Sequence, residues 1–436
     1  MPATAESTAP ATAEPTIPPA IPPATPPASA DVPLLAIVSL SLAAAASGMA
    51  LRLTDALLPR LASEFSISLG QASLVITVFA VAYGLSQALF GPLGDRYGKY
   101  RVIAWACAAS ALTSLACALA PGWHALLLAR LLAGATAAAV IPLSMAWIGD
   151  VVPYERRQPV LARFLIGQIG GFSFGVWAGG FTAEHLPWRT PFFALALLFL
   201  LMAWVLRRAR RGLPATALQT AARPGGAAPR RPFAAMAAEF GAVLSQPWAR
   251  VVLVVVFFEG AAVYGPFAFI ASHLHQRFGL PLSTVGGLVM AYAGGGLVFA
   301  IAARQLVARL GEERLVRWGA LLMAGALLAL ALLPAWAWAV PACAVMGLGF
   351  YMMHNTLQTH ATQMAPERRG AAVAAFAACL FLGQAAGVGV AGLLVGQIGT
   401  AWVLAAGAAA LPPVAAFFIH RLRRRAVLPA QPAAAG

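Results

Sequence analysis

The chain of 436 residues is poor in charged residues and in cysteine. Only 10% of its residues are charged, whereas a soluble protein carries about a quarter, so the composition argues against a soluble globular protein. Its four cysteines lie in apolar stretches and form no CxxC pair, and no His/Cys/carboxylate cluster has metal-ligand spacing. There is no Walker loop for ATP. We therefore expect no enzyme activity, no cofactor and no bound metal.

Long apolar runs fill most of the chain, which is 61% hydrophobic with a mean hydropathy of +0.79. A helix that crosses a membrane needs about 20 mostly apolar residues. Twelve such runs can be counted, which predicts twelve transmembrane helices. The expected spans are 34–58, 70–92, 101–120, 124–147, 159–182, 188–207, 250–272, 283–303, 314–333, 335–358, 371–394 and 399–420.

The basic residues indicate how these spans cross the membrane. The net charge is +15, but the arginines fall between apolar segments rather than along one face, which argues against a nucleic-acid partner. With the N-terminus in the cytoplasm, 24 of the 29 basic residues lie in cytoplasmic segments, as the positive-inside rule requires. We predict a multi-pass protein of a bacterial inner membrane with both termini cytoplasmic and its basic loops facing anionic lipid.

An internal repeat divides the chain. The motif Glu-Arg-Arg begins at Glu155 and again at Glu367, an offset of 212 residues. The same offset maps three glycines onto three others: Gly171 onto Gly383, Gly175 onto Gly387 and Gly180 onto Gly392. Equivalent halves are a mark of transporter folds, so we predict an all-α integral membrane protein of two pseudo-symmetric six-helix bundles. The expected parts are a disordered Pro/Ala-rich cytoplasmic tail (1–33), an N-terminal bundle (34–207), a cytoplasmic linker (208–249), a C-terminal bundle (250–421) and a cytoplasmic tail (422–436).

Residues 91–101 place one acid, three bases and three glycines between two apolar runs. So short a connection requires two membrane helices to turn at the bilayer surface, where glycines let backbones approach closely. The sequence therefore predicts a tight turn, which is called the gating loop below because of the resemblance described at the end of this section. Its candidate residues are Gly91, Asp95, Arg96, Gly98, Lys99 and Arg101.

Glu259 is the most telling ionisable residue inside a predicted span. It lies about ten residues into its helix, or roughly 15 Å at 1.5 Å per residue, which is close to the membrane midplane. Ionisable side chains at that depth are costly and usually functional. We interpret Glu259 as a proton-binding residue; the alternative is a permanently protonated or paired structural glutamate.

Three more charged residues lie within or near helix ends. Arg52 and Asp55 have the i, i+3 spacing that allows a pair on one helix face, and form either a proton or cation site or an interfacial anchor. Arg130 cannot lose its charge, so it needs an acid, carbonyl groups or an anionic solute, unless it extends to the membrane surface.

Polar side chains in two other spans are candidates to line a solute cavity. His354 and Gln358 share one helix face with Asn355 beside them, and His354 could relay a proton or bind solute. Interhelical hydrogen bonding is the alternative. Tyr83 and Gln87 form a similar i, i+4 pair. We expect His360, near the cytoplasmic end, to be solvated.

Glycines recur at every fourth position of the fifth span, at Gly167, Gly171, Gly175 and Gly179. Such a stripe predicts close helix packing, and it could also mark a bend or seal between conformational states.

Residues 34–425 resemble the major facilitator superfamily of secondary transporters. Gly91, Asp95, Arg96, Gly98 and Lys99 match the family's loop between helices 2 and 3, with Tyr100 where a second base is usual. The resemblance implies that this loop latches the cytoplasmic side, with Arg96 or Lys99 paired to Asp150 at the end of helix 4.

Three further motifs resemble proton-coupled members of that superfamily. Arg130–Gly134 is similar to the helix 4 motif linked to proton transfer. Gly171–Gly180 is similar to the helix 5 motif of the antiporter branch, with Val176 in place of the usual proline. Thr54–Pro59 resembles the end of helix 1 in drug:proton antiporters and sugar-efflux relatives.

We therefore expect proton-coupled efflux of a small amphipathic or cationic solute by alternating access, performed by a monomer. Glu259 and Asp55 would be the carboxylates for which solute and proton compete. The alternative is a symporter that imports a sugar or organic acid, with Arg130 and Arg52 binding the anion. A non-transporting membrane sensor or scaffold is a third reading, against which the charges inside the spans argue.

Overall fold

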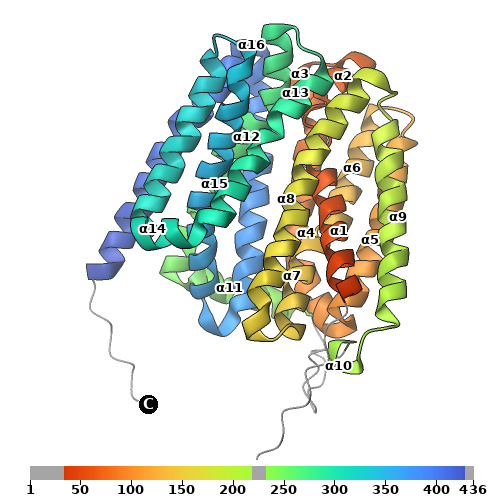
Figure 1. Cartoon of the computed structure of the whole chain (residues 1–436), viewed down its shortest axis with the longest axis vertical. Helices are drawn as coiled ribbons and strands as arrows, with labels where there is room; N and C mark the ends of the chain where they lie inside the picture. Colours follow the sequence, from red (N-terminus) through yellow and green to blue (C-terminus); the bar gives the residue numbers. More distant parts are fainter. Residues whose placement is uncertain (1–33, 219–231, 428–436) are drawn as a thin grey trace, which may run out of the picture. The chain divides into compact units, whose positions relative to one another are not determined.

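The computed structural model describes residues 34–218 and 232–427, and these residues form helices and no strands (Figure 1). The first half contains α1 (Leu34–Arg52), α2 (Leu58–Glu64), α3 (Leu69–Ala72), α4 (Leu74–Tyr97), α5 (Lys99–Ala118), α6 (Trp123–Ala137), α7 (Val140–Val151), α8 (Tyr154–His185) and α9 (Thr190–Arg210). Between the halves lie α10 (Ala215–Leu218) and α11 (Pro232–Ser245). The second half contains α12 (Pro247–Phe278), α13 (Leu282–Val289), α14 (Ala291–Leu332), α15 (Ala339–Gln363) and α16 (Arg369–Val427), with short 3-10 turns at Trp336–Trp338 and Pro366–Arg368. The predicted tail 1–33 lies outside the described residues.

Ten segments of the described chain are long and apolar enough to cross a membrane. Two of them are double-length and contain a glycine with non-helical backbone angles, Gly311 in α14 and Gly399 in α16. Dividing the segments at these glycines yields twelve spans. The predicted twelve-helix fold is therefore confirmed. Helices suit a membrane because each one satisfies its own backbone hydrogen bonds.

The first span ends earlier than predicted. α1 stops at Arg52 and residues 53–57 form turns before α2, whereas the sequence predicted one helix over 34–58. The amide of Asp55 donates to the carbonyl of Arg52 at 3.1 Å within these turns. Asp55 therefore lies in an irregular segment between two helices.

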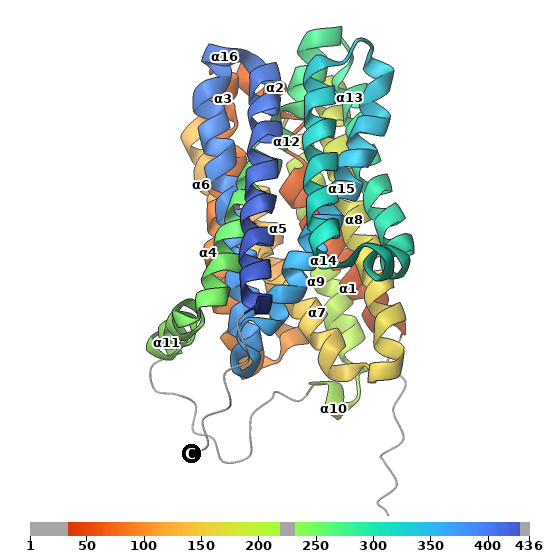
Figure 2. The ribbon, with the colours of Figure 1, turned by 90° about the vertical axis from the view of Figure 1, so that its left-hand side faces the viewer.

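The segment between the two halves is more helical than expected for a linker. α9 continues to Arg210, and α10 and α11 occupy much of the described part of 208–249. Figures 1 and 2 show α10 and α11 at the end of the bundles where α8 begins. This end, which also carries Arg96–Arg101 and Arg421–Arg425, is called the arginine-rich end below; the opposite end, with α2, α3 and α13, is the arginine-poor end.

Helix packing repeats between the halves with the offset found in the sequence. A methyl group on Gly171 of α8 would lie 2.3 Å from the carbonyl oxygen of Ala45 in α1, and one on Gly383 of α16 would lie 2.0 Å from that of Phe257 in α12. Ala45 and Phe257 are themselves 212 residues apart. Gly175 against Met49 and Gly387 against Ala261 repeat the same relation. The glycine stripe therefore has the packing role predicted for it, once in each half.

Buried apolar residues form two large clusters, one mainly from α1–α9 and one mainly from α12–α16. Large apolar side chains are exposed on the outer helix faces, among them Leu112, Leu197, Ile301 and Leu393. An apolar exterior around a packed interior is what a bilayer requires of a helical protein.

Candidate functional site

Arg130 of α6 is buried, with 1% of its surface exposed. Its Nε donates to the carbonyl of Val75 at 3.2 Å, its Nη1 and Nη2 donate to that of Ala50 at 3.3 and 3.4 Å, and Nη2 donates to Thr54 Oγ1 at 3.5 Å. The guanidinium also lies 4.1 Å from the ring centre of Phe79. The alternative that Arg130 extends to the membrane surface is therefore wrong.

Arg52 and Asp55 form the predicted pair, with 3.5 Å between Nη1 and Oδ2. Both residues are buried within the protein. The second carboxylate oxygen, Oδ1, has no hydrogen-bond partner among the described residues. Asp55 is also near enough to Arg130 for their charges to interact. Asp55 thus interacts with two arginines, so the cluster of Arg52, Asp55 and Arg130 has one more positive than negative charge when all three are ionised.

Arg52 extends from the first half to the second. Its guanidinium carbon lies 4.1 Å from the ring centre of Tyr264 and 5.0 Å from that of Phe267, both on α12. A cation over an aromatic face is attracted by the ring quadrupole. The charged cluster of the first half is therefore joined to the aromatic interior of the second.

Glu259, which is buried, and His354, which is half-buried, form a pair between α12 and α15. His354 Nδ1 lies 2.9 Å from Glu259 Oε2, and no part of Glu259 is exposed. Phe350 stacks on the imidazole at 4.8 Å between ring centres, and Phe376 lies 5.3 Å away. Glu259 Oε1 has no partner in the described chain. The sequence assigned these two residues separate roles, whereas the structure combines them in one hydrogen bond.

The remaining cavity candidates are more scattered. Tyr83 is buried and stacks on Phe79, the ring that also contacts Arg130, and its ring centre lies 4.3 Å from that of Phe381 on α16. Gln87 is buried one turn further along α4. Tyr83 therefore connects the Arg130 cluster to the second half.

Asn355 and Gln358 are half-buried on α15, towards the arginine-rich end from His354. Within the described residues, neither side chain joins the hydrogen-bonded pair of Glu259 and His354. The structure therefore gathers only part of the predicted solute-binding set.

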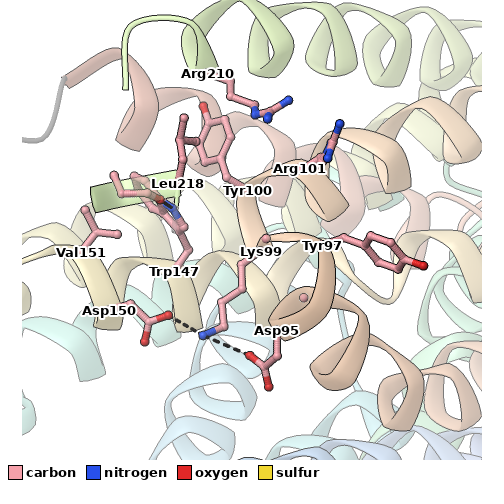
Figure 3. Close-up of a pocket in the computed structure, with 13 residues that line it drawn as sticks. Asp95, Tyr97, Lys99, Tyr100, Arg101, Trp147, Asp150, Val151, Arg210 and Leu218 are labelled. Atoms are coloured by element: carbon pink, nitrogen blue, oxygen red, sulfur yellow. Dashed lines mark hydrogen bonds and ion pairs between the residues drawn. The ribbon is translucent and has the colours of Figure 1, made fainter. Parts of the chain in front are cut away.

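Lys99 connects the acids at the arginine-rich end (Figure 3). Its Nζ contacts the carboxylates of Asp95, at 3.6 Å, and of Asp150. Of the two bases proposed to pair with Asp150, the structure brings Lys99 to it, while Arg96 lies over the ring of Tyr97. The guanidinium of Arg101 lies 5.1 Å from the ring centre of Trp105.

The predicted loop at 91–101 is shorter than the sequence suggested. α4 continues to Tyr97 and α5 begins at Lys99, which leaves only Gly98 between them. Gly98 has φ of 88°, a conformation that glycine adopts without strain. Gly94 packs closely on Leu143, but a methyl group on Gly91 would meet nothing within 4 Å. The prediction that backbones approach closely at Gly91 is therefore wrong, because α4 continues through this residue without a neighbouring backbone.

The two halves contact each other at the arginine-poor end. A methyl group on Gly180 of α8 would lie 2.2 Å from the carbonyl oxygen of Leu282 at the start of α13, and one on Gly70 of α3 would lie 2.0 Å from that of Gly392 in α16. Gly179, by contrast, packs on Leu53 within its own half. The Glu184 carboxylate accepts a hydrogen bond from the Ser283 amide at 3.0 Å and a second from its hydroxyl. These contacts close this end.

His360 is buried rather than solvated. Its Nε2 lies 3.1 Å from Glu312 Oε2, and its ring packs between Trp248 and Phe418. The expectation of a solvated side chain is wrong because Trp248, at the start of α12, covers the ring.

Sequence reasoning missed the aromatic side chains around the charged groups. Tyr264 and Phe267 lie at i, i+3 spacing shortly after Glu259, and that spacing was the available signal. It also missed the contact between α10 and the gating region, where Trp147 Nε1 donates to the carbonyl of Ala217 at 3.0 Å.

The fold and the site define a multi-pass membrane protein in which two pseudo-symmetric six-helix bundles hold ionisable side chains away from water and lipid. Residues 40–388 match the Major Facilitator Superfamily, and the chain belongs to this family. It is a transporter and not an enzyme.

Two relatives illustrate the similarity in sequence. The chain is 26% identical to the uncharacterised transporter YceJ of Bacillus subtilis (strain 168) over 347 residues, 78% of this chain and 84% of YceJ. It is 30% identical to the multidrug export protein EmrB of Escherichia coli (strain K12) over 156 residues, 36% of this chain but only 30% of EmrB.

Solved structures share the fold. A bacterial homologue of the human lysosomal transporter Spinster, in an inward-facing and unoccupied conformation, has a TM-score of 0.70 at 18% identity and covers 91% of this chain and 98% of its own. The nucleoside transporter NupG also has a TM-score of 0.70, at 14% identity, covering 90% of this chain and 99% of its own.

Proposed function

We propose that this protein is a proton-coupled efflux transporter that exchanges protons for a small amphipathic or cationic solute. The observation that carries the proposal is the pair of Glu259 and His354, 2.9 Å apart, with a carboxyl group of which no part is exposed. A buried acid and imidazole in contact can share, gain and lose one proton, because histidine changes charge near neutral pH. The partial similarity to EmrB supports export.

The cluster of the first half is the second proton-linked group. Asp55 pairs with Arg52, lies near Arg130 and has one oxygen without a partner among the described residues, so a proton on this carboxylate would release Arg52. Proton binding at Asp55 and at Glu259 therefore changes contacts on both sides of the interface between the bundles. This gives protons a means of favouring one conformational state over the other.

The distribution of charge supports an orientation. We propose that the arginine-rich end faces the cytoplasm of a bacterium, with the protein a monomer in the inner membrane. The contacts of Gly180 with Leu282 and of Gly70 with Gly392 close the opposite end, which would face the outside. The Lys99 cluster then belongs to the cytoplasmic gate.

Everted membrane vesicles test the coupling. With a proton gradient imposed, addition of ethidium or another transported cation should dissipate the gradient in vesicles that contain the protein. Glu259→Gln should abolish this exchange, whereas Glu64→Gln, which changes an exposed acid at the arginine-poor end, should leave it unchanged. Normal exchange by Glu259→Gln would remove this residue from the mechanism.

One observation favours a second candidate, proton-linked uptake of an anion. Arg52 and Arg130 share the single acid Asp55, and the excess positive charge would suit a carboxylate or phosphate. In that case right-side-out vesicles should accumulate an anionic solute when acidified outside, and Arg130→Gln should prevent this accumulation.

A further inference from the structure

The guanidinium of Arg52 occupies a site built from aromatic side chains. It lies 4.1 Å from the ring centre of Tyr264 and 5.0 Å from that of Phe267. Tyr264 and Phe267 belong to α12 in the second half, while Arg52 ends α1 in the first. We name the pair of rings the aromatic cage. Such rings attract any desolvated cation, and a guanidinium is one example of their ligands.

The aromatic cage is continuous with the proton-binding pair. The Tyr264 ring packs edge-on against Phe350 at 5.4 Å, and Phe350 stacks on His354 at 4.8 Å. His354 in turn contacts Glu259. A cationic solute in the cage would therefore lie against the same aromatic wall that supports the buried acid.

Arg52 is held only loosely by its own half. Among the residues that the structure describes, its one ion pair is the 3.5 Å contact with Asp55, at the limit of a hydrogen bond, and Asp55 also interacts with Arg130. A guanidinium can form two parallel hydrogen bonds to a carboxylate, and Asp55 Oδ1 is buried without a partner in the described chain. Asp55 Oδ1 could therefore accept a second hydrogen bond from Arg52 if the guanidinium left the cage.

We propose that the aromatic cage of Tyr264 and Phe267 is the binding site for the positively charged group of the solute, and that Arg52 is a tethered occupant which the solute displaces. The ligand class is an organic cation with delocalised or quaternary charge. This inference rests on the proposed function, whose substrate class it specifies. On displacement, Arg52 moves onto both oxygens of Asp55.

The displacement links solute to proton. Arg52 can pair fully with Asp55 only while that acid is ionised, so solute binding disfavours its protonation, and protonation returns Arg52 to the cage. The charged or titratable groups that face this exchange are Arg130 from the first half and three tyrosines from the second, with Glu259 and His354 further along the wall. The tyrosines are Tyr264 on α12, Tyr292 on α14 and Tyr351 on α15. Because coupling between two ligands is reciprocal, the proton must expel the solute as strongly as the solute expels the proton.

Binding to the purified full-length protein in detergent, with no gradient, tests the proposal. The probes are ethidium, followed by fluorescence anisotropy, and tetraphenylphosphonium as its competitor. Arg52→Gln removes the tethered cation and should tighten ethidium binding about tenfold, equivalent to about 1.4 kcal/mol. Arg52→Lys keeps a cation and should bind nearly as the parent protein does. Tyr264→Leu should weaken binding about tenfold, whereas Tyr264→Phe, which keeps the ring, should not.

Several outcomes would overturn the proposal. Unchanged or weaker ethidium binding by Arg52→Gln would show that Arg52 does not compete for the site. Binding of benzoate that disappears in Arg52→Gln would show that the arginine itself binds an anionic solute. If Tyr264→Leu fails to fold, Phe267→Leu replaces it as the test of the rings. If neither variant folds, the effect of Arg52→Gln on ethidium binding still tests the proposal.

The proposed function can fail separately. If Arg52→Gln tightens ethidium binding but vesicles exchange no protons, the aromatic cage stands and proton coupling is wrong. If vesicles exchange ethidium for protons while neither Arg52→Gln nor Tyr264→Leu alters binding, the cage is wrong and the coupling stands.

Discussion

His354 Nδ1 lies 2.9 Å from Glu259 Oε2, so a hydrogen bond joins a histidine of α15 to a carboxyl group of α12 in the interior of the second bundle. Neither residue could remain there alone at low cost. Removing one partner of a buried charged pair typically costs about 3–5 kcal/mol if the other stays ionised.

His354→Ala should remove the hydrogen-bond partner of Glu259. We expect the dependence of transport on pH between about 5.5 and 8 to change, because histidine is the side chain that ordinarily changes its charge in this range. The measurement is ethidium exchange in vesicles across that pH range. His124→Ala, a change of a histidine at the start of α6, is the control and should keep the parent profile. A pH profile of His354→Ala that matches the parent would contradict this role.

Gly171→Ala should destabilise the first bundle. The added methyl group would lie 2.3 Å from the Ala45 carbonyl oxygen, so α1 and α8 must separate. Overpacking of this kind costs about 1–3 kcal/mol, which thermal unfolding of the purified protein would detect. Gly170→Ala is the matched control, because its methyl group meets nothing within 4 Å. Equal melting temperatures for both variants would argue against close packing at Gly171.

Gly180→Ala should favour opening of the arginine-poor end. Its methyl group would clash with the Leu282 carbonyl oxygen at 2.2 Å, across the interface between the halves. A cysteine introduced at Ser73, which is fully buried beside Gly392, reports opening by its rate of maleimide labelling. We expect this rate to rise several-fold when Gly180→Ala is added to Ser73→Cys. The protein without the Ser73 change measures labelling of the native cysteines, and an unaltered rate would mean that this contact does not hold the end closed.

Lys99→Gln should change transport more than stability. The carboxylates of Asp95 and Asp150 that it contacts are more than half exposed, and exposed ion pairs contribute only about 0.2–1 kcal/mol. We therefore expect a melting temperature close to the parent value and a transport rate reduced several-fold, since the acids would separate when their shared cation is lost. Arg304→Gln is the control, because Arg304 is an exposed base of α14 that lies outside the gating loop. A variant that is strongly destabilised, or that transports normally, would show that Lys99 is not a gate residue.

The architecture could be predicted because it follows from simple requirements. The twelve spans reflect the length and apolarity that a bilayer demands, and the glycines of α8 indicate packing because only a missing side chain lets helices approach so closely. The contact between Lys99 and Asp150 could be predicted because both residues lie at helix ends and the resemblance to the family implies that they pair.

The site itself could be predicted only in part. Glu259 and Arg130 were conspicuous as charges in apolar helices, but helices that are apolar on every side give no sign of how each is rotated about its axis. The pairing of Glu259 with His354, 95 residues apart, depends on that rotation. Tyr264 and Phe267 were missed because aromatic residues in such helices are equally suited to face lipid.

Gly171 contacts Ala45 in the same way as Gly383 contacts Phe257, so equivalent substitutions in the two halves can be compared within one molecule. A substitution at Gly171 or Gly175 has a twin 212 positions away in equivalent surroundings, within the same protein, preparation and membrane. Where twin substitutions differ in effect, the difference must come from what the two halves do not share, chiefly the arginines of one and the glutamate–histidine pair of the other.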